Sequence, residues 1–273
     1  MLPKKGIDIP LLISAVLLVG IGIIMVFSSS YTYALSNTGD GAHYFKRVLM
    51  WSGLGMVVLF IFSACPYRLW RKLSSLLMLI SIILLVVVLT PAGKEVNNAQ
   101  RWLQFGGFSF MPSEVAKFAM IIYMADRMER SQHRIKTFRD GCLPHLLLGG
   151  ILFTLIYNQP DFSTGIIILA VMMVMLFVSG VHLAHFAGLI IAGAASMTAA
   201  LAYIFMSGHG YKARRLIAYL DPWMDPMDSG LQTIQSLLAI GSGGLTGRGI
   251  GKSIQKHLYL PEPQNDFIFA IIG

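Results

Sequence analysis

The chain has 273 residues, of which 55% are apolar and only 12% are charged. Because soluble globular proteins carry about 25% charged residues, this composition excludes an ordinary water-soluble protein. The net charge of +8 would suggest nucleic acid in a soluble protein. In a membrane protein it reflects topology and attraction to anionic lipid. We therefore expect an all-α, polytopic membrane protein with no nucleic-acid partner.

Seven apolar stretches are candidates for membrane spans, each of which needs about 20 largely apolar residues. They cover residues 11–28, 48–65, 73–90, 113–127, 143–157, 163–180 and 183–206, and an eighth begins at Phe267. The first stretch follows Lys4 and Lys5. Since six further spans follow it, we interpret it as an uncleaved signal anchor rather than a cleaved signal peptide.

The distribution of Lys and Arg in the short loops predicts the orientation of the chain, because these residues concentrate on the cytoplasmic side. With the N-terminus in the cytoplasm, ten lie inside and four outside. The inside set is Lys4, Lys5, Arg68, Arg71, Lys72, Arg127, Arg130, Arg134, Lys136 and Arg139, and the outside set is Lys46, Arg47, Lys94 and Arg101. Cys65 and Cys142 fall near span ends on the inside, so no disulfide is expected.

The outer side carries the long connections, at about 31–47, about 91–112 and 207–266. In the largest, Leu231, Ile234, Leu237 and Leu238 recur at helical spacing, which predicts a short helix on or in the bilayer surface. The run GSGGLTGRGIGK follows and is predicted to be a flexible turn. It is no phosphate-binding loop of the ATPase type, because Thr246 stands where that pattern needs glycine.

Ionisable residues at the outer membrane edge are the informative set. Glu114 and Lys117 fall in the first turn of the fourth span, either as a structural ion pair or as part of a cavity lining. Asp161, after Pro160, is either a plain N-cap or a site residue. His182 and His185 are spaced as two metal ligands would be, but no third ligand is near, so interfacial histidines are the better interpretation.

The long outer segment opens with a basic cluster, Lys212, Arg214 and Arg215, and closes with Glu262 and Asp266. The cluster is either a solvated patch that meets lipid headgroups or a clamp for a phosphate or diphosphate, which arginine binds in bidentate fashion. An ionised carboxylate at the start of an apolar run costs free energy because it leaves water, so its presence there indicates a functional role. Together these groups suit a lipid-linked substrate that bears phosphate.

Three blocks, in order, carry a resemblance to a known family: RWLQFGGFSFMPSEVAK, NQPDFSTG, and the long run from ARRLIAYLDPWMDP to QNDFIFA. They resemble the shape, elongation, division and sporulation (SEDS) proteins RodA, FtsW and SpoVE, from about Pro10 to the end. The match is closest to the FtsW and SpoVE branch.

The resemblance implies a bundle of ten transmembrane helices in the bacterial cytoplasmic membrane. The implied activity is that of a peptidoglycan glycosyltransferase, which polymerises lipid II beside a class B penicillin-binding protein and other divisome or elongasome proteins. By the same resemblance Asp266 is the general base. Candidates to stabilise the leaving diphosphate, with or without a divalent cation (Mg²⁺ or Mn²⁺), are Arg101, Lys117, Arg214 and Arg215. Trp102, Glu114, Asp161 and Glu262 are expected to shape the cavity.

Residues 1–273 are expected to form one membrane domain of this type, with 207–266 as its large extracytoplasmic loop. The family pattern continues past Gly273, so we expect a fragment or a truncated product. A lipid II flippase and a non-catalytic scaffold for the penicillin-binding protein are the alternatives. The sequence does not distinguish elongation, division and sporulation.

Overall fold

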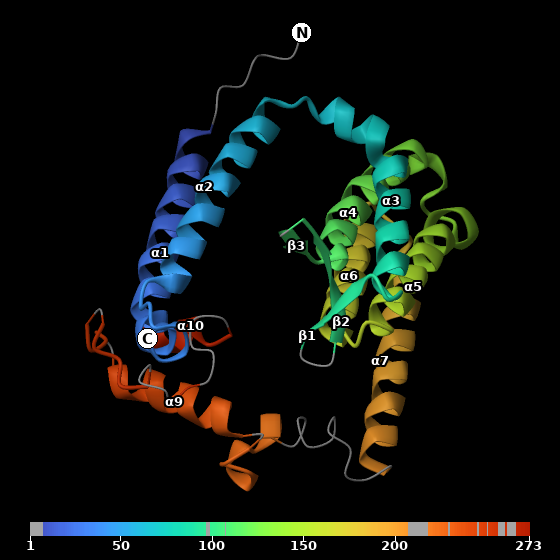
Figure 1. The fold of residues 1–273 in the computed structure, drawn as a ribbon. Coiled ribbons are helices and arrows are strands. Elements are labelled where there is room, and N and C mark those ends of the chain that lie inside the picture. The colour runs from blue at the N-terminus through green and yellow to red at the C-terminus, as the bar shows by residue number, and fades with distance from the viewer. Residues whose placement is uncertain are drawn as a thin grey trace. The chain divides into compact units, whose positions relative to one another are not determined.

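A computed structural model gives the architecture, which is almost entirely helical (Figure 1). It describes residues 8–96, 99–106, 108–206, 218–228, 230–244, 246–249, 251–255, 260 and 266–273. The chain divides into two compact units. One combines Met1–Ala64 with Ala200–Gly273, and the other is Cys65–Ala199.

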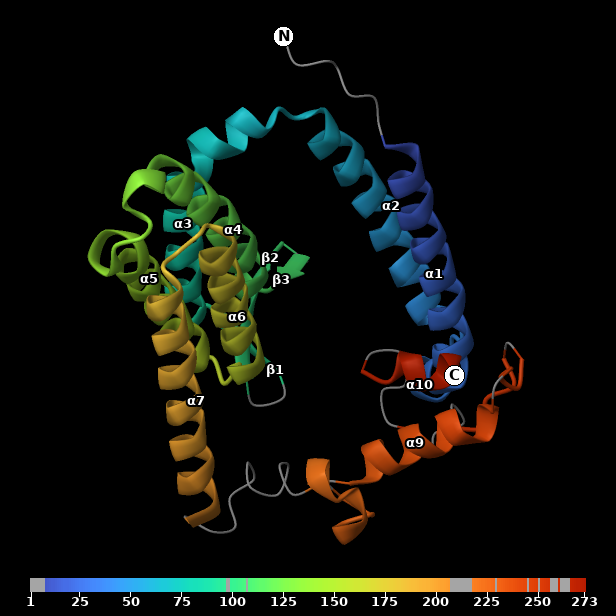
Figure 2. The same ribbon diagram turned by 180° about the vertical axis from the view of Figure 1, so that it is seen from behind.

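The first unit is built on a helical hairpin. Its elements are α1 (Ile9–Thr38), α2 (His43–Ala64), η3 (Pro222–Met224), α9 (Leu231–Gly243) and α10 (Ile268–Ile272). Helix α1 starts where the Asp8 carboxylate accepts a hydrogen bond from the Leu11 N–H at 3.2 Å. It ends at Gly39, whose φ of 73° favours glycine. Helices α1 and α2 then run side by side in both views (Figure 1, Figure 2).

The second unit holds most of the buried apolar core. Its elements are α3 (Tyr67–Val88), β1 (Gly93–Val96), β2 (Ala99–Phe105), β3 (Phe108–Phe110), α4 (Pro112–Arg130), η1 (Gln132–Arg134), η2 (Phe138–Cys142), α5 (Leu143–Tyr157), α6 (Phe162–Val178) and α7 (Leu183–Met206), the last of which runs on into the first unit. Helix α3 packs along α4, and α5 along α6. Leu85, Met120, Leu152, Ile156 and Ile168 are fully buried between them.

The connection between α3 and α4, predicted as an outer loop, folds into a three-stranded antiparallel sheet in the order β1-β2-β3. Lys94 pairs with Trp102, and Leu103 pairs with both Gly93 and Phe110. Leu103 is 1% exposed, and β2, the strand that carries it, contacts α3 and α4. These strands were not predicted, although the alternation in QRWLQF is typical of a half-buried strand.

Apolar side chains cover the outside of the helices, as they do in proteins that lie in lipid. Among the described residues, five segments are long and apolar enough to cross a membrane: Ile9–Thr38, His43–Ala64, Tyr67–Val88, Phe138–Tyr157 and Leu183–Ala200. Helix α6 is apolar but has only 17 residues, and α4 carries several charges. Each of the seven predicted stretches contains a helix, and α10 begins one residue after Phe267, so the predicted fold class is confirmed.

Candidate functional site

Arg101, on β2, contacts the turn between α5 and α6. Its Nε donates a hydrogen bond to the Gln159 carbonyl at 3.2 Å, and its Nη2 donates to the Pro160 carbonyl. Its Nη1 lies 3.9 Å from the Asp161 carboxylate. One cation therefore ties the sheet to the turn that carries Asp161, which the sequence could not predict because the two segments lie 58 residues apart.

Asp161 caps α6, as one of the two predicted interpretations held. Its Oδ1 accepts from the Thr164 N–H at 3.3 Å, and its side chain is 6% exposed. Its Oδ2 is buried without a donor among the described residues, and so is Oε1 of the fully buried Gln159. The Gln159 amide donates to the Leu85 carbonyl of α3 at 3.4 Å. Sequence reasoning missed Gln159, which joins three elements around Asp161.

Glu114 and Lys117 form the predicted ion pair in the first turn of α4, with 2.7 Å between Oε1 and Nζ. The Glu114 side chain is 59% exposed and the Lys117 side chain 25%. The carboxylate lies at a helix N-terminus, where it interacts favourably with the helix dipole. Trp102 is half-buried on β2, next to Arg101 in the sequence. All these residues belong to the second unit.

Asp266, the predicted general base, belongs to the first unit and lies just before α10. It is exposed and forms no hydrogen bond or ion pair with another described residue. The predicted Lys212, Arg214, Arg215 and Glu262 lie outside the described residues. Of the nine predicted site residues, the structure therefore describes six, in two separate units.

The helix predicted from Leu231, Ile234, Leu237 and Leu238 is present as α9, and its place at the bilayer surface stays a prediction. The glycine-rich run after it turns as expected, with positive φ at Gly244, Gly247, Gly249 and Gly251. The turn, the end of α9, α10 and two residues of α1 line a pocket of about 250 Å³.

His182 and His185 lie 5.4 Å apart, measured between ring centroids. The described part of the chain contains no group of three His, Cys, Asp or Glu side chains placed to hold a metal ion. The two cysteines are free.

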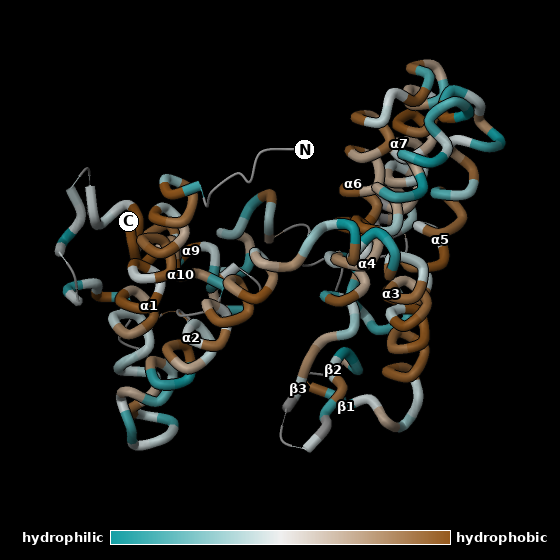
Figure 3. The backbone as a smooth tube through the Cα atoms, turned by 90° about the horizontal axis from the view of Figure 1, so that it is seen from above, coloured by the Kyte–Doolittle hydropathy of each residue, from teal (hydrophilic) through white to brown (hydrophobic). Residues whose placement is uncertain are grey.

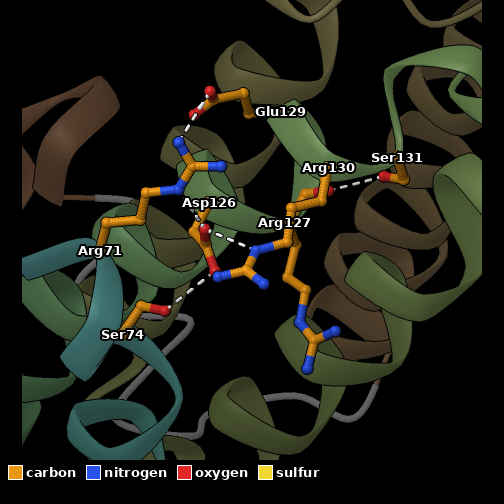
Figure 4. Close-up of polar contacts among 7 residues, drawn as sticks. All are labelled: Arg71, Ser74, Asp126, Arg127, Glu129, Arg130 and Ser131. Carbon is orange, nitrogen blue, oxygen red and sulfur yellow. Dashed lines mark hydrogen bonds and ion pairs between the residues drawn. The ribbon is translucent and has the colours of Figure 1, made fainter. Parts of the chain in front are cut away.

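A charged cluster between α3 and α4 was not predicted (Figure 4). The Asp126 side chain is 4% exposed and accepts from Arg71 Nε at 3.1 Å, Arg130 Nε at 2.8 Å and Ser74 Oγ at 3.1 Å. Glu129 accepts from Arg71 Nη1 at 3.0 Å. The spacing of Asp126 and Arg130 in the sequence suits an ion pair on a helix, but the partner on α3 is 55 residues away.

The fold and these polar groups define a multi-pass helical membrane protein with ionisable residues at its helix ends. The chain belongs to the FtsW, RodA and SpoVE family, described as cell cycle proteins, whose family model matches residues 2–273. It is 42% identical over 271 residues to stage V sporulation protein E of Bacillus subtilis, covering 99% of this chain and 73% of that protein. It is 36% identical over 270 residues to the probable peptidoglycan glycosyltransferase FtsW of a Geobacter species, covering 98% and 72%.

Solved structures agree with the family. One comes from a study of structural coordination of polymerization and crosslinking by a peptidoglycan synthase complex. It matches with a TM-score of 0.66 and 27% identity, over 84% of this chain and 65% of that chain. Another, the rod shape determining protein RodA of Thermus thermophilus, matches with a TM-score of 0.54 and 25% identity, over 65% and 56%. The chain thus spans about two thirds or less of the length of these solved chains.

Proposed function

We propose that this chain is a peptidoglycan glycosyltransferase that polymerises lipid II into glycan strands at the outer face of the cytoplasmic membrane. Membership of the FtsW, RodA and SpoVE family supports the proposal, as do relatives that are named peptidoglycan glycosyltransferases. The N-terminus then lies in the cytoplasm, which places the sheet, the α5–α6 turn and the 207–266 loop outside.

The observation that carries the mechanism is the exposed Asp266 carboxylate at the head of α10. As general base it takes the proton from the acceptor sugar's 4-hydroxyl while that oxygen attacks the anomeric carbon of the donor. The new C–O bond forms as the bond from the anomeric carbon to the diphosphate oxygen breaks. Undecaprenyl diphosphate leaves with the bonding electron pair, and positive charge is needed to stabilise it.

Arg101, Lys117, Arg214 and Arg215 are the proposed sources of that charge, with a divalent cation as a further one. Trp102, Glu114, Asp161 and Glu262 would shape the substrate cavity. The contacts of Arg101 with two backbone carbonyls and of Lys117 with Glu114 hold both cations in place before substrate arrives. Such fixed charges need little reorganisation during the reaction.

The proposed partner is a class B penicillin-binding protein that crosslinks the new strands. A structural neighbour described as a peptidoglycan synthase complex, which couples polymerization with crosslinking, supports this part of the proposal. In the partner's absence the chain would supply polymerisation alone.

The test is polymerisation of purified lipid II by the protein together with its partner, read as glycan length on a gel. Asp266→Asn removes the base and keeps the side-chain volume, so we expect a loss of about 100-fold or more in rate. Asp228→Asn, at another exposed aspartate of the same unit, is the matched control and should retain activity. If Asp266→Asn polymerised lipid II as fast as an active Asp228→Asn control, Asp266 would not be the general base. Lipid II that crosses liposomes without being polymerised would point to a flippase instead.

A further inference from the structure

Basic side chains gather at the end of the second unit where α3 begins, α4 ends and α5 begins. The two segments that meet there, residues 65–72 and 126–142, carry eight Lys and Arg against three Asp and Glu, a net charge of +5. That they meet is established by the bonds from Arg71 and Ser74 on α3 to Asp126 on α4. In Figure 3, seen from that end, the segment that joins α4 to α5 is largely hydrophilic.

The charged cluster uses only part of this charge. Arg71 and Arg130 are neutralised by Asp126 and Glu129. The other basic residues at this end form no ion pair with any described residue, and they are exposed. They are Arg68, Lys72, Arg127, Arg134, Lys136 and Arg139, which we call the basic rim.

Three members of the basic rim, Arg134, Lys136 and Arg139, are presented by a compact backbone. Ile135, between the first two, is 3% exposed and joins the apolar core. The Thr137 N–H donates to the Arg134 carbonyl at 3.0 Å, and the Gly141 N–H donates to the Thr137 carbonyl at 2.9 Å.

Gly141 packs so closely that a Cβ there would lie 2.3 Å from the Ile135 carbonyl oxygen. Because the core and these bonds order the segment, its cations need little further ordering to bind a ligand.

Apolar and aromatic side chains lie among these cations. Tyr67 is 67% exposed, Leu69 is 44% exposed and Phe138 is 43% exposed. Two candidate membrane spans, Tyr67–Val88 and Phe138–Tyr157, begin at two of these residues. A basic rim at the start of two spans lies where a bilayer's headgroups meet its acyl chains. A phospholipid offers a phosphate to the cations and acyl chains to the apolar groups, so this alternation matches a lipid. An acidic protein would be bound by the cations alone and would leave the apolar groups without a role.

We propose that the basic rim binds the phosphate headgroups of anionic phospholipids, with phosphatidylglycerol as the probe. This site lies at the opposite end of α3 and α4 from the β-sheet and does not depend on the proposed glycosyltransferase activity. Since each basic residue near an anionic surface contributes about a fivefold gain in binding, removing three should weaken binding by about 100-fold at low salt.

The experiment measures binding of fluorescent phosphatidylglycerol to the purified protein in neutral detergent micelles. The variant is the triple Arg134→Gln, Lys136→Gln and Arg139→Gln. The matched control removes three exposed cations from elsewhere, Lys46, Arg47 and Lys94, by the same change to glutamine. We expect the first triple to lose about 100-fold in affinity and the control to lose less than about threefold. Thermal unfolding of both verifies that they fold.

Three results would overturn the proposal. The two triple variants could bind phosphatidylglycerol equally. Inorganic phosphate at millimolar concentration could displace the lipid completely, which would indicate a site for free phosphate. Phosphatidylcholine could bind as tightly as phosphatidylglycerol, and an acidic peptide could bind to the basic rim in place of the lipid. Together these two results would indicate a protein partner. Weakening of phosphatidylglycerol binding by salt is the expected companion result.

Discussion

Replacing Asp126 by asparagine removes the negative charge that Arg71, Arg130 and Ser74 share (Figure 4). Hydrogen bonds to a charged group contribute about 1.5–3 kcal/mol each, and breaking a buried ion pair from one side costs about 3–5 kcal/mol. Here the Arg71 and Arg130 side chains are 38% and 58% exposed, so both recover water when the carboxylate is lost. We therefore expect Asp126→Asn to lower the free energy of unfolding by about 2–3 kcal/mol.

Glu129→Gln is the matched control, because Glu129 also bonds to Arg71 but is 63% exposed. An exposed pair contributes about 0.2–1 kcal/mol, so this variant should be nearly as stable as the parent. Equilibrium unfolding in mixed micelles measures both. A second readout is the thiol reactivity of Cys142, which is fully buried at the start of α5, in a Cys65→Ser background. Equal free energies of unfolding for the two variants, with Cys142 equally protected in both, would show that Asp126 contributes no more than an exposed pair.

Three further predictions concern packing, pH and the sheet. Gly149→Leu should lower the free energy of unfolding by about 1–3 kcal/mol, because α6 lies against Gly149. Gly150→Leu points into open space and should leave the stability nearly unchanged. Unfolding assays that rank the two variants in the reverse order would contradict this packing. The hydrogen bond from Lys46, with that from a backbone N–H, holds the pKa of Asp40 below its ordinary value. The ion pair therefore stabilises the fold above about pH 3.9, and this contribution is lost as the pH falls through the folded pKa. Asp40→Asn should lower the free energy of unfolding at neutral pH and leave it unchanged in acid. Unfolding measured against pH tests this. Arg101→Met should cost about 1.5–3 kcal/mol and expose the sheet to protease, and unchanged cleavage would argue against the contact with the α5–α6 turn.

The helices could be predicted because a span needs a long apolar run, and such a run is visible without any partner. The local caps could be predicted for the same reason: the hydrogen bond of Asp161 to the Thr164 N–H and the pair of Glu114 with Lys117 each span three residues. The sheet between α3 and α4 was missed, since its strands are short and its alternation is brief.

Long-range polar contacts could not be predicted. The contact of Asp126 with Arg71 on α3 depends on how two helices pack and not on sequence spacing. The same holds for Arg101 and for Gln159, an uncharged residue that carries no sequence signal. Asp266 was identified through its place before an apolar run and through the family resemblance, and its role as base stays a prediction.

The Arg101 contact is directed at the main chain of the α5–α6 turn, since both carbonyls that accept from it belong to the backbone. Such hydrogen bonds depend on where the backbone carbonyls lie and not on which side chains the turn carries. The side chains of Gln159 and Pro160 can therefore vary without loss of these two hydrogen bonds, provided that the path of the chain is kept. A single change at the arginine, in contrast, has no counterpart in the turn that could compensate for it.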